Sequence, residues 1–319
     1  MENKYYVFLM DPFESLNFET ETSLLLIEQL QLQGRKSLWV EPKDLVLSHN
    51  QLHIYGQEVV SVHPFSLGEK KLYTPESFAA FINRKDPPFD LHFLQMTLLL
   101  DFLPASLLQV NPPQALQKFN EKLFGLLWPE LTPPSITSQD FGHLSRFILE
   151  HGSVIIKPLD ECSGRGIVKI QTKDKNWEET LKEILSLGNQ PKWLTLQAFL
   201  EDVAQGDKRI YLADGEPIGW VNRVPKEGSY LANIHQGALC EATELSARDL
   251  EIIEAIKPTL QREKILFVGL DVIGGFITEI NITSPSAIRQ INEVMGKKCE
   301  IEMVDLIIQK AEAPQSPLT

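Results

Sequence analysis

The sequence predicts a chain of two parts: an amino-terminal α/β unit with a parallel sheet, followed by an α+β unit with antiparallel strands. Three observations lead to this fold class. The chain has 319 residues, more than a single core usually supports. It opens with a strand–helix–strand pattern, which is typical of parallel sheets. Beyond about residue 120 the pattern changes to short strands separated by Gly-containing turns, which indicate antiparallel hairpins.

The elements of the first unit follow from local patterns. An apolar run over residues 5–10 predicts a buried strand that Asp11-Pro12 ends. Leu and Ile recur at helical spacing over residues 22–32 and stop at Gly34, which predicts a helix. Residues 37–40 again resemble a strand, and an apolar helix is expected after the loop 84–90. Because prolines interrupt the next stretch, we place a domain boundary near residue 120, giving units 1–120 and 121–319.

The second unit contains two hairpin signals. Residues 154–156 form a predicted strand that ends in Lys157, and residues 194–200 form another. Asp214-Gly215 and Gly274-Gly275 each lie between two strand-like segments, as expected of hairpin turns. Antiparallel strands in this number suit a nucleotide held between two sheets.

Charge and composition exclude several classes of partner. The formal net charge is −13, which repels nucleic-acid phosphates and anionic lipid. The richest apolar stretch, residues 96–108, contains Asp101 and Pro104 and is too short to span a bilayer. The amino terminus shows no signal-peptide pattern, and the three cysteines show no metal-ligand spacing. We therefore expect a cytoplasmic protein that binds small molecules and neither nucleic acid nor membrane.

The second hairpin carries candidate metal ligands. Alternation of polar and apolar residues up to Ile282 places Glu279 and Asn281 on one strand face. Together with Asp271 they offer the hard oxygen ligands that Mg²⁺ on a polyphosphate requires. Asp271 shares that face only if the loop of the hairpin has an odd number of residues, so we expect such a loop. The alternative is an ordinary hairpin with a solvated polar face.

Several cations lie beside predicted strands. Lys157 ends a strand and precedes Gly164 and Gly166, whose backbone N–H groups could approach phosphates closely. Arg209 and Arg223 are suited to fork-shaped recognition of carboxylate or phosphate. Taken singly, each of these segments, like Lys122 at a predicted helix start, is also compatible with a solvated surface position.

In their order along the chain, these segments resemble prokaryotic glutathione synthetase, of the ATP-grasp superfamily, over almost the whole length. The stretches that carry the resemblance are Met10-Asp11-Pro12, Arg84-Lys85-Asp86-Pro87-Pro88-Phe89-Asp90, Asn120-Glu121-Lys122-Leu123-Phe124, Lys157-Pro158-Leu159-Asp160, Gly206-Asp207-Lys208-Arg209, Phe267-Val268-Gly269-Leu270-Asp271, Thr278-Glu279-Ile280-Asn281-Ile282-Thr283-Ser284-Pro285 and Ile288-Arg289.

The resemblance implies an amino-terminal domain and an ATP-grasp fold whose central and carboxy-terminal subdomains cover about 121–200 and 201–319. It implies ATP and Mg²⁺ as cofactors, γ-glutamylcysteine and glycine as substrates, an acyl-phosphate intermediate and a homo-oligomer. The implied residues fall into four groups: for the nucleotide Lys122, Lys157, Gly164, Gly166, Gln197, Ala198, Phe199, Leu200 and Asp207; for Mg²⁺ Asp271, Glu279 and Asn281; near the transferred phosphate Arg209 and Arg223; for the peptide substrate Arg84, Asn233, Ser284 and Arg289.

Three segments depart from the family pattern. The loop after Lys157 has Glu161 and Ser163 where glycines are usual, and the predicted lid, residues 224–236, has fewer glycines and lacks an expected Arg. Glu19-Thr20-Glu21 stands where a lysine usually precedes an acid. Two alternatives therefore stay open: a related ATP-grasp ligase with another amino acid or peptide substrate, and a non-catalytic nucleotide-binding protein.

Overall fold

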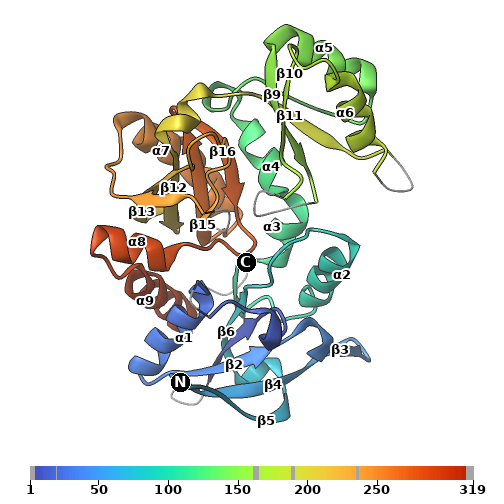
Figure 1. The fold of residues 1–319 in the computed structure, drawn as a ribbon. Coiled ribbons are helices and arrows are strands. Elements are labelled where there is room, and N and C mark those ends of the chain that lie inside the picture. The colour runs from blue at the N-terminus through green and yellow to red at the C-terminus, as the bar shows by residue number, and fades with distance from the viewer. Residues whose placement is uncertain (1–3, 19, 161–164, 188–190, 235–236, 314–319) are drawn as a thin grey trace.

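The structure is a computed structural model that describes residues 4–18, 20–160, 165–187, 191–234 and 237–313. Within these residues the strands form three sheets, one in the amino-terminal part and two in the remainder (Figure 1). The first sheet lies at the bottom of the view, and the two antiparallel sheets lie above it, joined by the segment that carries α3 and α4. The predicted combination of an α/β part with an antiparallel part is confirmed.

The amino-terminal sheet has a parallel centre and an antiparallel extension. β1 pairs in parallel with β2 and β6, and β6 with β7, whereas β2, β3 and β5 are antiparallel to β4. The strands are β1 (Tyr5–Leu9), β2 (Lys36–Val40), β3 (Leu45–Ser48), β4 (Gln51–Val62), β5 (Phe65–Tyr73), β6 (Phe78–Asn83) and β7 (Leu108–Val110). The predicted β1–α1–β2 opening is confirmed, with α1 at Thr22–Leu32. The hairpin β4–β5 was not predicted, because most of β5 is exposed and lacks a clear apolar alternation.

Residues 135–198 contribute a four-stranded antiparallel sheet in the order β10-β9-β11-β8. The strands are β8 (Ser135–Ser138), β9 (Ser153–Pro158), β10 (Val168–Gln171) and β11 (Leu194–Ala198). Helices α5 (Phe141–His151) and α6 (Trp177–Leu185) share a separate core with this sheet. Val154 and Ile156 of β9 point into that core, so strand alternation turns Ile155 and Lys157 to the other face.

The third sheet is antiparallel, in the order β14-β13-β12-β15-β16. Its strands are β12 (Asp207–Ala213), β13 (Glu216–Val224), β14 (Leu239–Glu241), β15 (Phe267–Ile273) and β16 (Phe276–Asn281). Helix α7 (Ala247–Arg262) joins one core with this sheet, whereas α8 (Ile288–Met295) and α9 (Cys299–Glu312) join another. Both predicted hairpins, β12–β13 and β15–β16, are present.

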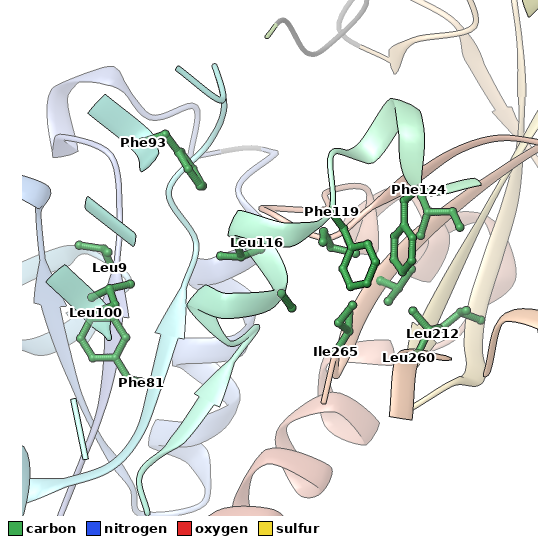
Figure 2. Packing of buried hydrophobic residues seen from close by; sticks show 14 of the residues in the cluster. Leu9, Phe81, Phe93, Leu100, Leu116, Phe119, Phe124, Leu212, Leu260 and Ile265 are labelled. Atoms are coloured by element: carbon green, nitrogen blue, oxygen red, sulfur yellow. The ribbon is translucent and has the colours of Figure 1, made fainter. Parts of the chain in front are cut away.

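One core connects the amino-terminal domain with the third sheet. Figure 2 shows Leu9, Phe81 and Leu100 on one side, Leu260 and Ile265 on the other, and the segment with Leu116, Phe119 and Phe124 between them. The rings of Phe119 and Phe124 stack with their centroids 4.1 Å apart. This segment comprises α3 (Pro113–Lys118) and the short helix α4 (Glu121–Phe124), whereas Leu100 belongs to α2 (Leu91–Leu100). The apolar contact fixes the amino-terminal domain against the third sheet, and so places its loops beside β15 and β16.

Candidate active site

A cavity of about 370 Å³ lies between the two antiparallel sheets and reaches the amino-terminal domain. Most of the residues predicted from the sequence line it. These are Arg84, Lys157, Gln197, Ala198, Phe199, Leu200, Asp207, Arg209, Arg223, Asn233, Asp271, Glu279, Asn281 and Ser284. Lys122, Gly166 and Arg289 do not line it, and Gly164 is outside the described residues.

Lys157 is a half-buried cation at the end of β9. Its Nζ donates hydrogen bonds to Oε1 of Gln197 and to the carbonyl oxygen of Thr278, both at 2.9 Å. Burial lowers the pKa of Lys157, although the carboxylates of Glu279 and Asp207 act in the opposite direction. Since Thr278 belongs to β16, the lysine spans the cavity from one sheet to the other. A point charge held in this way is suited to a phosphate chain.

The strand end at Gln197–Leu200 borders the apolar part of the cavity. Ile155, Ile167 and Phe199 line this part together, and the ammonium group of Lys169 lies 3.3 Å from the centre of the Phe199 ring. Backbone groups of a strand end beside apolar side chains can bind a planar heterocycle by its edge and its faces.

The β15–β16 hairpin brings Asp271 and Glu279 together, but not in the predicted way. The odd-residue loop is wrong: Ile273 pairs with Phe276, so Gly274 and Gly275 form a two-residue turn, with positive φ at both. Pairing runs from Val272–Ile277 to Asp271–Glu279, which leaves Thr278 as a bulge. The bulge restores the same-face arrangement that the even turn would prevent.

Asp271 is held by two arginines. Its Oδ1 accepts from Nε of Arg209 at 2.5 Å and from Nη2 of Arg223 at 2.9 Å, and its Oδ2 accepts from Nη2 of Arg209 at 2.9 Å. Burial disfavours the ionised form, yet the two guanidinium groups hold the pKa of Asp271 below its usual value. Asp207 binds Arg223 at 2.7 Å, but burial raises the pKa of Asp207 to about 6. Two fixed guanidinium groups in a buried site can stabilise the negative charge that develops on a phosphoryl group while it is transferred.

The same hairpin offers oxygen ligands for a divalent cation. Glu279 lies 3.3 Å from Nζ of Lys122, and Asn281 donates from its amide nitrogen to Gly269 and Asp271. Within the described part of the chain no group of three or more His, Cys, Asp and Glu side chains is placed so that it could hold a metal ion by itself. Two carboxylates and one amide oxygen, completed by phosphate oxygens, nevertheless fit the usual ligands of Mg²⁺. Because four N–H groups already contact Asp271, a cation there would replace part of these contacts.

The amino-terminal domain contributes a second arginine-containing region. Arg84 is 2% exposed, donates to Ser23 and to the carbonyl oxygen of Pro285, and lies over the ring of Phe267. Its Nη1 is buried and has no hydrogen-bond partner within the described residues. Ser284 donates to the carbonyl oxygen of Arg84 at 3.2 Å. A buried guanidinium with an unused donor can bind the carboxylate of a ligand.

The segment between β13 and β14, named the covering segment here because the sequence predicts a lid at residues 224–236, lines the cavity. Its residues Tyr230, Leu231, Ala232, Asn233 and Ile234 line the cavity, while His235 is outside the described residues. The hydroxyl of Tyr230 accepts a hydrogen bond from the backbone N–H of Lys169 at 3.3 Å. Since Lys169 belongs to β10, this bond connects the covering segment of the third sheet to the four-stranded sheet.

Sequence reasoning assigned no role to several polar residues of the cavity. Among those that line it are Glu121, Asp86 and Gln290. Glu121 and Asp86 lie inside stretches that carry the family resemblance, which was the available signal. Nothing in the local pattern around Gln290 distinguishes it from an ordinary helix residue.

The fold and this site together define an ATP-grasp ligase, an enzyme that forms a carbon–nitrogen bond with ATP. Residues 5–117 match the family profile "Prokaryotic glutathione synthetase, N-terminal domain", and residues 121–296 match "Prokaryotic glutathione synthetase, ATP-grasp domain". The chain belongs to the prokaryotic glutathione synthetase family. In the described residues, no helix is long and apolar enough to cross a membrane.

Individual relatives agree with the family. The chain is 36% identical to the glutathione synthetase of Rhodopseudomonas palustris over 308 residues, covering 94% of this chain and 97% of the relative. It is 37% identical to that of Xanthomonas axonopodis over 302 residues, covering 91% and 93%. The fold is similar to the crystal structure of D-cycloserine synthetase DcsG, with a TM-score of 0.70 at 12% identity, covering 96% of this chain and 100% of the other.

Proposed function

We propose that this protein joins γ-glutamylcysteine and glycine to form glutathione, with ATP as the energy source and an acyl phosphate as the intermediate. The family to which the chain belongs supports this reaction. The single structural observation that carries it is the convergence of Lys157, the Arg209–Asp271–Arg223 cluster and Arg84 on one cavity. Such a cavity provides cations both for a polyphosphate and for a substrate carboxylate.

In the first step, an oxygen of the donor carboxylate attacks the γ-phosphorus of ATP. The bond from that phosphorus to the β–γ bridging oxygen breaks, and ADP leaves. Lys157 would hold the phosphates from the side of the four-stranded sheet, and Arg209 and Arg223 would stabilise the negative charge of the phosphoryl group in transfer. Arg84 would bind the second carboxylate of the donor and so orient the reacting one.

In the second step, the neutral amine of glycine attacks the carbonyl carbon of the acyl phosphate. The carbon–oxygen bond to phosphate breaks, inorganic phosphate leaves, and the nitrogen loses one proton. The covering segment at Tyr230–Asn233 would exclude water, which would otherwise hydrolyse the acyl phosphate. No protein nucleophile is needed.

Magnesium would be held by Glu279, Asn281 and Asp271. When bound, it would neutralise phosphate charge and hold the γ-phosphate in line with the donor. The roles of individual residues, the domain boundary near residue 120, the cytoplasmic location and the homo-oligomer belong to this proposal as well.

A second candidate is ligation of another carboxylate–amine pair by the same chemistry. Thr20 lines the cavity at a position where the family resemblance leads us to expect a lysine beside the acid Glu21. Without a lysine at this position of the cavity wall, the site could select a different carboxylate substrate. The non-catalytic alternative is not supported, because the chain belongs to a ligase family.

The test is a panel of amino acids, each incubated with the protein, γ-glutamylcysteine, ATP and Mg²⁺. Phosphate release and the mass of the product are measured together. We expect a tripeptide with glycine and little product with large amino acids. If no amino acid yields a tripeptide while another carboxylate–amine pair releases phosphate, the ligase assignment stands and the glutathione assignment is overturned.

A further inference from the structure

Glu121 lies in the wall of the cavity and is 8% exposed. It occupies the first position of α4, the short helix between the amino-terminal domain and the four-stranded sheet (Figure 1). Burial raises the pKa of its carboxyl group. A carboxylate kept in such a place needs an explanation, because burial disfavours its charge.

One oxygen of this carboxylate accepts three hydrogen bonds. The donors to Oε1 are the backbone N–H of Ile282 at 2.8 Å, the backbone N–H of Thr283 at 2.9 Å and the hydroxyl of Thr283 at 2.8 Å. These donors belong to the segment that directly follows β16. Without Glu121, two backbone N–H groups would be buried without partners, which costs more than the loss of ordinary surface bonds.

The segment that Glu121 holds is flanked by a proposed metal ligand on one side and by a residue of the Arg84 region on the other. Asn281 precedes Ile282 and belongs to the proposed metal ligands, and Ser284 follows Thr283 and contacts Arg84. The carbonyl oxygen of Ile282 is held from the other side by the amide nitrogen of Asn111 at 2.7 Å. Glu121 and Asn111 therefore hold this segment between them.

The neighbours of Glu121 connect α4 to the rest of the cavity. Asn120 caps α4 and donates to the carbonyl oxygen of Leu159, just after β9. Lys122 forms the ion pair with Glu279 of β16. Three consecutive side chains thus connect α4 to the two sheets that enclose the cavity.

We propose that Glu121 is a positioning residue of the ligase site, which fixes the segment from Asn281 to Ser284 through its single oxygen Oε1. The inference rests on the proposed function. Its role is geometric: the oxygen orders the backbone of residues 282 and 283, and the backbone orders the side chains on either side. Supporting groups of this kind typically change activity by about 10- to 100-fold.

The test uses variants that separate geometry from charge. Glu121→Gln keeps an oxygen at the position of Oε1 and removes the charge, whereas Glu121→Ala removes both. We expect Glu121→Ala to lower kcat/KM for the donor peptide about 10- to 100-fold, with ADP affinity changed less than about threefold, because the proposed nucleotide contacts at Gln197–Leu200 are on another strand. Glu121→Gln should restore most of the lost activity.

Thr283→Val supplies a second measurement, because it removes only the hydroxyl bond and nearly keeps the shape of the side chain. It should lower kcat/KM by less than Glu121→Ala, and it should have a smaller effect in the Glu121→Ala background than alone. Glu178→Ala, a surface change in α6, is the control for a lost carboxylate. Thermal unfolding and ADP titration of every variant show whether the fold is retained.

The outcomes are distinct. If the unchanged protein forms no tripeptide, the proposed function fails, and the positioning role is then judged by whether ADP-bound Glu121→Ala loses amide-exchange protection at residues 282 and 283 while Glu121→Gln keeps it. If Glu121→Gln is as inactive as Glu121→Ala, Glu121 acts through its charge and the positioning role is overturned. Unchanged kcat/KM in a folded Glu121→Ala variant overturns it as well.

Discussion

Asp271 and Glu279 are direct cross-strand partners in the β15–β16 hairpin, although the two-residue Gly274-Gly275 turn alone would place them on opposite faces. The bulge at Thr278 supplies the extra residue. It also allows Ile277 and Ile280, an odd number of positions apart, to enter the same core that contains α7. The hairpin can therefore bury both isoleucines and still present two carboxylates to the cavity.

The first prediction concerns the charge of Glu279. Replacing Glu279 with Gln should keep the fold and lower kcat at least about 100-fold, because an anionic ligand is lost where the phosphates bind. Activity is measured over a range of Mg²⁺ concentrations. Glu216→Gln, the same change at an exposed position of β13, is the control. Near-normal activity with an unchanged Mg²⁺ requirement would remove Glu279 from the metal site.

Lys157 should bind the phosphates of the nucleotide. We expect Lys157→Ala to weaken ATP binding by about tenfold or more and to slow turnover, since a cation in a partly dry cavity interacts strongly with phosphate. ATP and ADP affinities are measured by calorimetry. Lys182→Ala, in a surface ion pair of α6, is the control. Equal nucleotide affinity and rate in Lys157→Ala and the unchanged protein would contradict the assignment.

Tyr230 should keep the covering segment closed. Tyr230→Phe removes only the hydroxyl that accepts from the backbone of Lys169, so ADP should dissociate faster and more ATP should be hydrolysed per peptide formed. The ratio of phosphate to tripeptide and the ADP release rate are measured, with Tyr55→Phe, at an exposed position of β4, as the control. A ratio and a release rate identical to those of the control would show that this hydrogen bond has no part in closure.

Asp207 should make stability depend on pH. Because its pKa is raised to about 6 in the folded protein from the ordinary 3.8, its contribution to stability is fully present below the ordinary pKa and is lost as pH rises through 6. Relative to Asp207→Asn, the unchanged protein should lose about 1 kcal/mol of unfolding free energy between pH 5 and pH 7. Urea unfolding of both proteins at the two pH values measures this. If the two proteins differ in unfolding free energy by the same amount at pH 5 and at pH 7, the pKa of Asp207 is not raised.

Much of the site was predictable because strand alternation is a local property. The side of β9 that Lys157 occupies follows from the buried positions of Val154 and Ile156, and the turn residues marked both hairpins. The family resemblance, which depends on the order of the motifs along the chain, added the expected roles of the individual residues. The hairpin β4–β5 was missed because its solvated strand has no strong alternation.

The sequence alone determined the β1–α1–β2 opening, the two hairpins, the acidic net charge and the family resemblance, because these depend on neighbouring residues or on motif order. Only the tertiary structure decided the bulge at Thr278, the three hydrogen bonds of Glu121 and the contact of Arg84 with Pro285. Each of these features depends on two segments that come together only because both pack against the same core. The register of β16 is the clearest case: Thr278 and Glu279 are two successive polar residues, and the strand accommodates both because Ile277 and Ile280 each pack against the core of α7.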